Sequence, residues 1–404
     1  MSSPDITTAE LDAVREVLST AYLSIGPQID WFERAIAAYV GTRHAAGVSS
    51  GTAGLHLCVI AAGVGEGDLV ITTPFSFVAS ANCILYERAV PIFVDVDPAT
   101  GNVDPSLVAA SVADLSGGLE AGRRWLPPRI RDSMLQSSAA TRDPGVGRLR
   151  AILAVHVFGQ PADMDPIVEA ARRSGLFVIE DACEAIGAEY KGRQAGTLGD
   201  AAVFAFYPNK QMTTGEGGVI VTDRDDWDAL FRSLRNQGRD VFDAWLNHSR
   251  LGYNYRLDEL SAALGLAQLG RIEELLAKRE RVAQWYKERL ADIDGVELPY
   301  VAPTTTRMSW FVYVVRLASE VDRNVVMAAL EQRGVPSRPY FTPIHLQPFY
   351  RERFGYREGD FPVTEAIACR SLALPFSGTM AVEQVEYVCE QLAAILRQPL
   401  AYAG

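Results

Sequence analysis

The segment AFYPNKQMTTGEGG at residues 205–218 carries the strongest structural signal in this chain of 404 residues. An apolar strand pattern runs into a turn that presents one lysine, Lys210, and closely spaced glycines then lead into a second strand at 219–221. Glycines let the backbone turn tightly beside a bound group. A lysine in a partly desolvated pocket loses its proton readily and can then attack a carbonyl carbon. A lone lysine before a glycine turn is usually a surface residue, so its interpretation depends on the rest of the chain.

Short apolar runs on both sides of this segment alternate with helical patterns. Strands are predicted at 69–73, 91–96, 151–157, 177–179, 201–206 and 218–222, with helices at 53–62, 76–87 and 166–174. Repetition of strand, helix and strand is typical of an α/β sheet whose ligand site lies at the strand ends. The pattern predicts a large α/β domain over residues 22–257.

The remainder of the chain predicts a smaller α+β domain over residues 258–404, joined by an N-terminal helix within residues 1–21. Its expected elements are a long connecting helix from 258 to 292, a strand at 308–317 and helices at 325–333 and 382–397. Residues 116–148 contain Gly-Gly and Pro-Pro pairs and little periodicity. We expect them to be an irregular insertion at the surface of the large domain.

Composition and charge exclude several classes of function. A net charge of −12 and a pI near 5.0 argue against nucleic acid or an anionic membrane surface as partner. No apolar run approaches the roughly 20 residues of a membrane span, and the polar N-terminus does not resemble a secretory signal, so we expect a cytoplasmic protein. The five cysteines are scattered without a C-x-x-C pair, which argues against a disulfide framework or a metal site.

Two further motifs are weak alone and gain weight from their order before Lys210. The small-residue turn at Ser50-Gly51-Thr52 opens an apolar helix, and a helix N-terminus offers free N–H groups and a positive dipole end to a phosphate. Asp181 ends an apolar strand, where a carboxylate can keep a bound pyridine nitrogen protonated so that the ring accepts electrons. Taken singly, the turn is equally typical of an N-cap, and the acid of a cap or a solvated surface.

These motifs belong to a collinear series that resembles the sugar-nucleotide aminotransferases of the DegT/DnrJ/StrS type. The similar segments are VSSGTAGLH (48–56), TTPFSFVASAN (72–82), FVDVDP (93–98), HVFGQPADMD (156–165), EDACEAIG (180–187), the Lys210 segment, LGYNYR (251–256) and RPYF (338–341). The resemblance covers nearly the whole chain. It implies an α/β fold of the aspartate-aminotransferase type (fold type I), with a large mixed-sheet cofactor domain and a smaller α+β C-terminal domain. The implied cofactor is pyridoxal 5′-phosphate (PLP), which alternates with its amine form, PMP.

The resemblance assigns residues to the phosphate end of the cofactor. Gly51 and Thr52 would bind the phosphate, with a further hydroxyl from Ser50. Asn254 would reach the phosphate bound by the neighbouring subunit, which implies a homodimer with shared active sites. The family often has a serine five residues before the lysine, whereas this chain has Ala205. One hydrogen bond to the phosphate is then lost or is supplied by another group such as Ser50.

Other residues would contact the cofactor ring. Lys210 would form the Schiff base and act as the catalytic residue, and Asp181 would pair with the ring nitrogen. Phe77 would stack on the ring, and Glu184 would lie near the ring hydroxyl. Without the resemblance, Phe77 would be interpreted as a core aromatic residue and Glu184 as an acid on a helix surface.

The implied reaction is transfer of an amino group from an amino acid, with L-glutamate as the expected donor, to a keto-sugar nucleotide. The segments TTGEGG (213–218) and MSWF (308–311) look most like the C4 aminotransferases of the perosamine type. Related dehydratases have histidine in place of the lysine, so Lys210 favours transamination. Amination at C3, a cyclitol (inosose) acceptor and a non-catalytic regulator of the same fold remain alternatives. A nicotinamide-binding enzyme is disfavoured because no G-x-G-x-x-G follows the first strand.

Three further polar residues are candidates for lesser roles. His345 lies in a Pro-rich passage that resembles the substrate-side loop of the family, and we expect it, with Arg256, to contact the substrate. His156 ends a strand and is expected to be a packing or hydrogen-bonding histidine.

Overall fold

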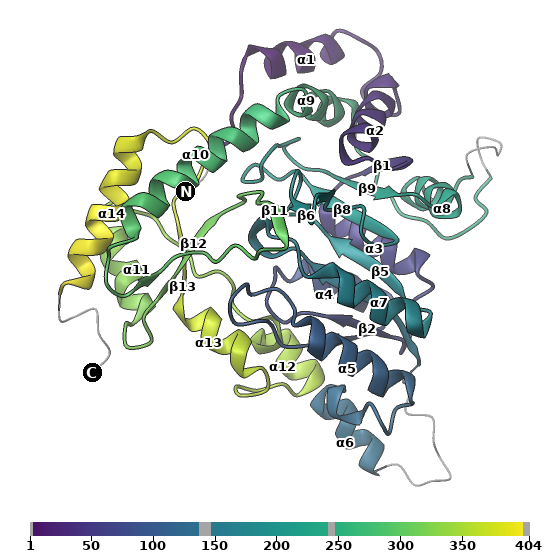
Figure 1. Ribbon diagram of the computed structural model, residues 1–404. Helices are drawn as coiled ribbons and strands as arrows, with labels where there is room; N and C mark the ends of the chain where they lie inside the picture. Colours follow the sequence, from purple (N-terminus) through teal and green to yellow (C-terminus); the bar gives the residue numbers. More distant parts are fainter. Residues whose placement is uncertain (1–2, 137–146, 241–246, 399–404) are drawn as a thin grey trace.

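The computed structural model describes residues 3–136, 147–240 and 247–398, and a seven-stranded sheet lies at its centre (Figure 1). The order is β1-β9-β8-β5-β4-β2-β3. The strands are β1 (His44–Val48), β2 (Leu69–Thr72), β3 (Val90–Phe93), β4 (Leu149–Val155), β5 (Phe177–Asp181), β8 (Ala201–Ala205) and β9 (Gly218–Thr222). β9 runs antiparallel to both of its neighbours, β1 and β8, and the other neighbouring strands of this sheet pair in parallel. Both faces are covered, which explains the nearly continuous apolar runs in the sequence.

Helices bury the two faces of this sheet in separate hydrophobic clusters. One face packs against α3 (Gly51–Ala61), α4 (Ala79–Tyr86) and α8 (Asp225–Arg235). The other packs against α2 (Pro27–Val40), α5 (Pro105–Ser116), α7 (Met164–Ser174) and α9 (Glu259–Leu269). The carboxyl ends of the parallel strands lie at one edge of the sheet. The loops after β5 and β8 meet the start of α3 there.

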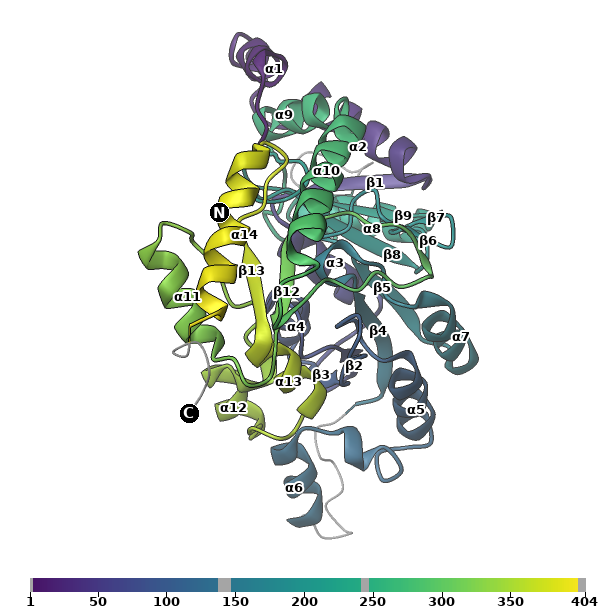
Figure 2. The ribbon, with the colours of Figure 1, turned by 60° about the vertical axis from the view of Figure 1, so that its left-hand side comes forward.

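A smaller antiparallel sheet, ordered β10-β12-β13, forms the second core of the molecule. Its strands are β10 (Val296–Glu297), β12 (Tyr313–Leu317) and β13 (Ser371–Leu374). In Figure 2 the helices α10 (Ile272–Leu290) and α14 (Val382–Leu396) lie side by side next to it, and α11 (Arg323–Gln332) packs on α14. The remaining elements include α1 (Thr8–Leu18), α12 (Pro348–Phe354), α13 (Pro362–Arg370) and a sheet of β11 (Thr305–Arg307), β6 (Glu189–Tyr190) and β7 (Arg193–Gln194).

Three predicted elements differ from the structure. The long helix expected from 258 to 292 is two helices, α9 and α10, because the chain turns at Gly270 and Arg271. The strand expected from 308 begins only at Tyr313, since residues 308–311 turn over the Lys210 segment. The segment 116–148 is not irregular throughout: it contains a 3-10 turn (Arg123–Trp125) and α6 (Pro128–Gln136), while residues 137–146 lie outside the described part. Within the described ranges, no helix is long and apolar enough to cross a membrane.

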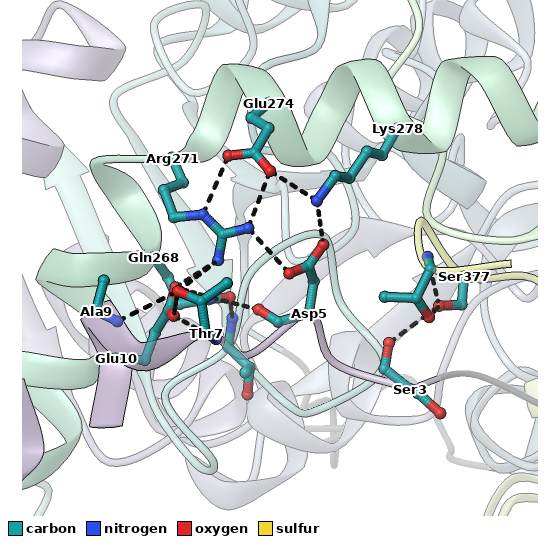
Figure 3. Close-up of polar contacts among 12 residues, drawn as sticks. Ser3, Asp5, Thr7, Ala9, Glu10, Gln268, Arg271, Glu274, Lys278 and Ser377 are labelled. Carbon is teal, nitrogen blue, oxygen red and sulfur yellow. Dashed lines mark hydrogen bonds and ion pairs between the residues drawn. The ribbon is translucent and has the colours of Figure 1, made fainter. Parts of the chain in front are cut away.

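The segment before α1 and the first turn of α1 are held against the junction of α9 and α10 by a network of ion pairs and hydrogen bonds (Figure 3). The Asp5 carboxylate accepts hydrogen bonds from Arg271 at 2.9 Å and Lys278 at 2.6 Å. Glu10, which is buried, accepts from Gln268 at 2.7 Å and from Arg271 at 2.8 Å. Gln268 also donates to the Asp5 carbonyl at 2.8 Å. The start of the chain thus packs against the helix that connects the two sheets.

The pKa of Glu10 makes this network sensitive to acid. Burial by itself raises that pKa, but hydrogen bonds from Thr7, Gln268 and Arg271 outweigh it and lower the pKa from 4.5 to about 2. A carboxyl whose pKa is depressed by folding stabilises the folded state above its unfolded pKa and loses that contribution as the pH falls toward its folded pKa. The network should therefore contribute fully at neutral pH and weaken below about pH 4.5.

We expect Glu10→Gln to lower the free energy of unfolding at neutral pH by about 1–3 kcal/mol, because a charged acceptor is lost from buried donors. Urea unfolding at a series of pH values should show the difference from wild type shrinking in acid. Glu16→Gln, at an exposed position of the same helix, is the control and should unfold like wild type. Equal stability of the Glu10 and Glu16 variants at all pH values would contradict the role of the network.

Candidate active site

A cavity of about 450 Å³ opens where α3, β5 and β8 meet at the edge of the central sheet. Seven of the residues predicted for cofactor binding line it: Ser50, Gly51, Thr52, Phe77, Asp181, Glu184 and Lys210. Segments of the C-terminal part close it from the other side through Phe311, Tyr340 and Phe341. The structure thus gathers residues that lie far apart in the sequence around one space.

The N-terminus of α3 forms one end of the cavity. Ser50 is the N-cap, and its hydroxyl accepts from the Ala53 N–H at 3.1 Å. The N–H groups of Gly51 and Thr52, in the first turn, have no acceptor within the helix and lie at the positive end of its dipole. This arrangement suits a phosphate. A hydroxyl that accepts one hydrogen bond can still donate its own hydrogen, so Ser50 can offset the missing serine at Ala205.

Gly51 has no side chain because there is no room for one. A Cβ there would lie 2.7 Å from the Ala205 Cβ and 2.8 Å from the Cys183 sulfur, which is closer than such atoms approach. The contact holds the start of α3 against the end of β8, directly before the turn that carries Lys210. It therefore fixes the separation between the anion-binding end of the cavity and the lysine.

The two acids at the end of β5 point in opposite directions, as successive residues of a strand do. Asp181 lines the cavity, and its carboxylate accepts from the Ser80 hydroxyl at 2.6 Å and the Cys183 N–H at 3.2 Å. Ser80 was not predicted as a site residue, because it belongs to a helix far from β5 in the sequence. Two donors hold the carboxylate in place and directed toward the cavity.

Glu180 has a structural role on the opposite side of the strand. Its buried carboxylate accepts from the backbone N–H groups of Gly196, Leu198 and Gly199 at 2.7–2.8 Å. The Nε2 of His156 lies 2.9 Å from Glu180, while its Nδ1 accepts from a backbone N–H. The prediction that His156 is a buried hydrogen-bonding residue is confirmed.

Lys210 extends into the cavity between an acid and an aromatic ring. Its Nζ lies 3.6 Å from Glu184 Oε1 and 3.8 Å from the centroid of the Phe311 ring. Burial raises the pKa of Glu184, and the nearby lysine charge offsets this only in part. Glu184 also accepts from the Phe158 N–H at 2.9 Å, so it is not an acid on a helix surface. The contact between Phe311 and Lys210 was not predicted, because the two residues lie far apart in the sequence.

Phe77 lies at the mouth of the cavity with 62% of its surface exposed. Phe77 is therefore not a core residue, and its exposed ring offers a face to a planar ligand. The cavity continues past Phe77 into a groove of about 790 Å³ that also contains Tyr86, Phe349 and Arg353.

Three predicted residues do not reach the cavity. Asn254 is exposed and pairs with Asn236, and Arg256 donates to the Asn236 side chain at 3.1 Å. His345 is fully buried, and its Nε2 lies 2.9 Å from Glu365. It lines neither the cavity nor the adjoining groove, and its contact with the substrate stays a prediction. The acid that His345 meets, Glu365, lies in the first turn of α13.

Comparisons with known proteins agree with this geometry. The profile of the DegT/DnrJ/EryC1/StrS aminotransferase family matches residues 4–393. The chain belongs to this family. It is 38% identical over 400 residues to a GDP-perosamine synthase from Caulobacter vibrioides, covering 98% of each chain. It is 33% identical to a putative pyridoxal phosphate-dependent aminotransferase, EpsN, from Bacillus subtilis, covering 97% of this chain and 94% of EpsN.

The fold is likewise that of solved family members. The crystal structure of S. venezuelae DesV in complex with a ketimine intermediate superposes with a TM-score of 0.83 at 31% identity, covering 97% of this chain and 95% of DesV. The predicted fold type I architecture, the transaminase activity and the PLP cofactor are confirmed by these similarities. The protein is a PLP-dependent aminotransferase, and the acids, helix terminus and lysine of its cavity fit that cofactor.

The different surroundings of Glu180 and Asp181 predict unequal losses of stability when each is replaced. Glu180→Ala would leave three backbone N–H groups, two of them buried, without an acceptor and should lower the free energy of unfolding by about 3 kcal/mol or more. Asp181→Asn keeps the shape and the accepting oxygen and should cost under about 1 kcal/mol. Urea unfolding of the cofactor-free variants measures both. If Asp181→Asn were as destabilising as Glu180→Ala, Asp181 would be a structural acid.

Proposed function

We propose that the enzyme moves the amino group of L-glutamate to the C4 keto group of a nucleotide-linked sugar. The observation that carries this proposal is the full-length similarity to a GDP-perosamine synthase, together with a lysine at position 210 of the cavity. The same relative favours a GDP-linked acceptor as the first to be tested. Lysine at this position can carry a proton to and from carbon, which amino transfer requires.

We further propose a role for each residue at the cofactor. When bound, PLP supplies an electron sink for the carbanion formed at the substrate α-carbon. Asp181 would hold the proton on the ring nitrogen, and Phe77 would pack against the ring. Glu184 would lie beside the ring hydroxyl. Lys210 would bond to the cofactor through Nζ and, once displaced by the amino acid, would move a proton between the α-carbon and the cofactor C4′.

The phosphate would lie at the other end of the cavity. The N–H groups of Gly51 and Thr52 and the hydroxyl of Ser50 would donate to its oxygens. Their support is geometric, since all three line the cavity at the start of α3. The proposed assembly is a cytoplasmic homodimer with shared sites. Asn254, which is exposed and outside its own cavity, would reach the phosphate of the neighbouring subunit. Arg256, two residues on, would then face the substrate across the same interface.

Replacement of the lysine tests the proposed chemistry. Lys210→Ala should lower kcat by at least about 1,000-fold, because both the covalent attachment and the proton carrier are lost. The visible absorption band of its bound cofactor should no longer lie at the wild-type wavelength. Lys191→Ala, at an exposed lysine paired with Asp165, is the control and should keep full activity. Turnover retained in the Lys210 variant would refute the assignment.

A substrate screen tests the acceptor. GDP-, UDP- and dTDP-linked 4-keto and 3-keto sugars and an inosose should be incubated with glutamate, and the aminated product identified by mass spectrometry. We expect a 4-amino product from a nucleotide-linked sugar. A 3-amino sugar or an aminocyclitol as the main product would replace the proposed acceptor. A cofactor band that fails to respond to any amino acid would favour a regulator.

A further inference from the structure

Arg279, on α10 behind the cavity, is a buried cation with an unusual set of partners. Only 4% of its surface is exposed, and within the described part of the chain no carboxylate forms an ion pair with it. Burial lowers its pKa to about 10, so the guanidinium stays charged at neutral pH. The preceding residue, Lys278, is by contrast paired with Asp5 and Glu274 (Figure 3). A buried charge without a carboxylate partner costs stability, so packing alone does not account for an arginine here.

All four hydrogen bonds of Arg279 go to backbone carbonyls of two segments that flank the active-site lysine. Nη2 donates to the carbonyl of Lys210 at 2.6 Å and to that of Asn209 at 3.2 Å. Nη1 donates to the carbonyls of Phe311 at 3.1 Å and Trp310 at 3.2 Å. A planar guanidinium presents its donors in a fixed fork, which a lysine cannot do. One side chain thereby joins the Lys210 turn to the segment before β12.

These two segments set the surroundings of the reactive amine. The ring of Phe311 lies 3.8 Å from Lys210 Nζ, and the Lys210 turn follows β8 of the central sheet. Gln211 makes a second link, since its side chain donates to the Glu184 carbonyl at 2.6 Å and to the Ser309 hydroxyl at 2.8 Å. None of these hydrogen bonds involves the Nζ of Lys210.

We infer that Arg279 is a positioning residue for Lys210. Its guanidinium fixes the main chain of Lys210 against the Phe311 segment. The backbone of the lysine then keeps one position while Nζ moves between cofactor and substrate. A displacement of about 1 Å from that position can cost about 100-fold in rate. The inference rests on the proposed role of Lys210 as the residue that bonds the cofactor. It concerns placement of the amine, and Arg279 itself touches neither cofactor nor substrate.

The test replaces Arg279 and follows the half-reaction with glutamate, which needs no sugar. Arg279→Met should lower the single-turnover rate constant by about 100-fold. The half-saturating glutamate concentration should change by less than about threefold. That concentration rises on its own only when contacts are lost that bind the substrate and the transition state equally well. Arg279→Lys, which keeps the charge without the fork, should recover only part of the rate. Arg281→Met, an exposed arginine on the same helix, is the matched control and should react like wild type.

Two readouts separate positioning from general damage to the fold. The first is the pH at which the visible cofactor band changes, which should shift in Arg279→Met and not in Arg281→Met. The second is borohydride trapping followed by peptide mapping, which should show less cofactor on Lys210 at equal protein and cofactor concentration. Far-UV circular dichroism establishes that each variant is folded. If Arg279→Met does not fold, the Arg279→Lys variant decides, with an expected rate loss of about 10-fold.

The outcomes distinguish this inference from the proposed function. A wild-type rate constant and an unshifted pH midpoint in a folded Arg279 variant would overturn the inference alone. Wild-type protein that carries no trapped cofactor on Lys210 would overturn the role of that lysine and the inference with it. A lowered rate with a shifted midpoint, absent from Arg281→Met, supports the inference.

Discussion

The contact between α3 and the ends of β8 and β9 is the constraint on which the site depends. Gly51 and Gly218 permit it, since a Cβ on Gly218 would lie 2.8 Å from the Gly51 nitrogen. Protein interiors are packed too densely to accommodate such an overlap without moving the backbone. Because α3 lies this close, its free N–H groups and the Lys210 turn border the same cavity. A cofactor with a phosphate at one end and a reactive carbon at the other needs this spacing.

The packing of these elements also determines where charges lie in the cavity. The helix terminus supplies partial positive charge at one end, and Asp181 supplies a negative charge held by Ser80 and Cys183. Glu184 lies beside Lys210, and burial raises its pKa. The strand alternation that places Asp181 in the cavity turns Glu180 away from it. One acid lines the cavity and its neighbour supports the fold, although they are adjacent in the sequence.

The site is also shared between the part of the chain that forms the central sheet and the part that forms the β10-β12-β13 sheet. Phe311, Tyr340 and Phe341 come from the part of the chain that contains the smaller sheet, and Arg279 ties that part to the Lys210 turn. Further out, Arg316 on β12 donates to the Ala99 carbonyl, which follows β3. The N-terminal segment is fastened to the start of α10 on the outside. The position of the lysine thus depends on contacts made by both parts.

The sequence by itself determined the alternating α/β architecture, the family and seven of the residues that line the cavity. These follow from local patterns: strand and helix periodicity, small-residue turns and collinear motifs. Only the tertiary structure decided the partners of the side chains. It brought Ser80 to Asp181 and Phe311 to Lys210, divided the long helix at Gly270, and buried His345 against Glu365. The physical reason is that periodicity reports which face of an element is buried. The polar group that each buried side chain meets is set by packing between segments far apart in the chain.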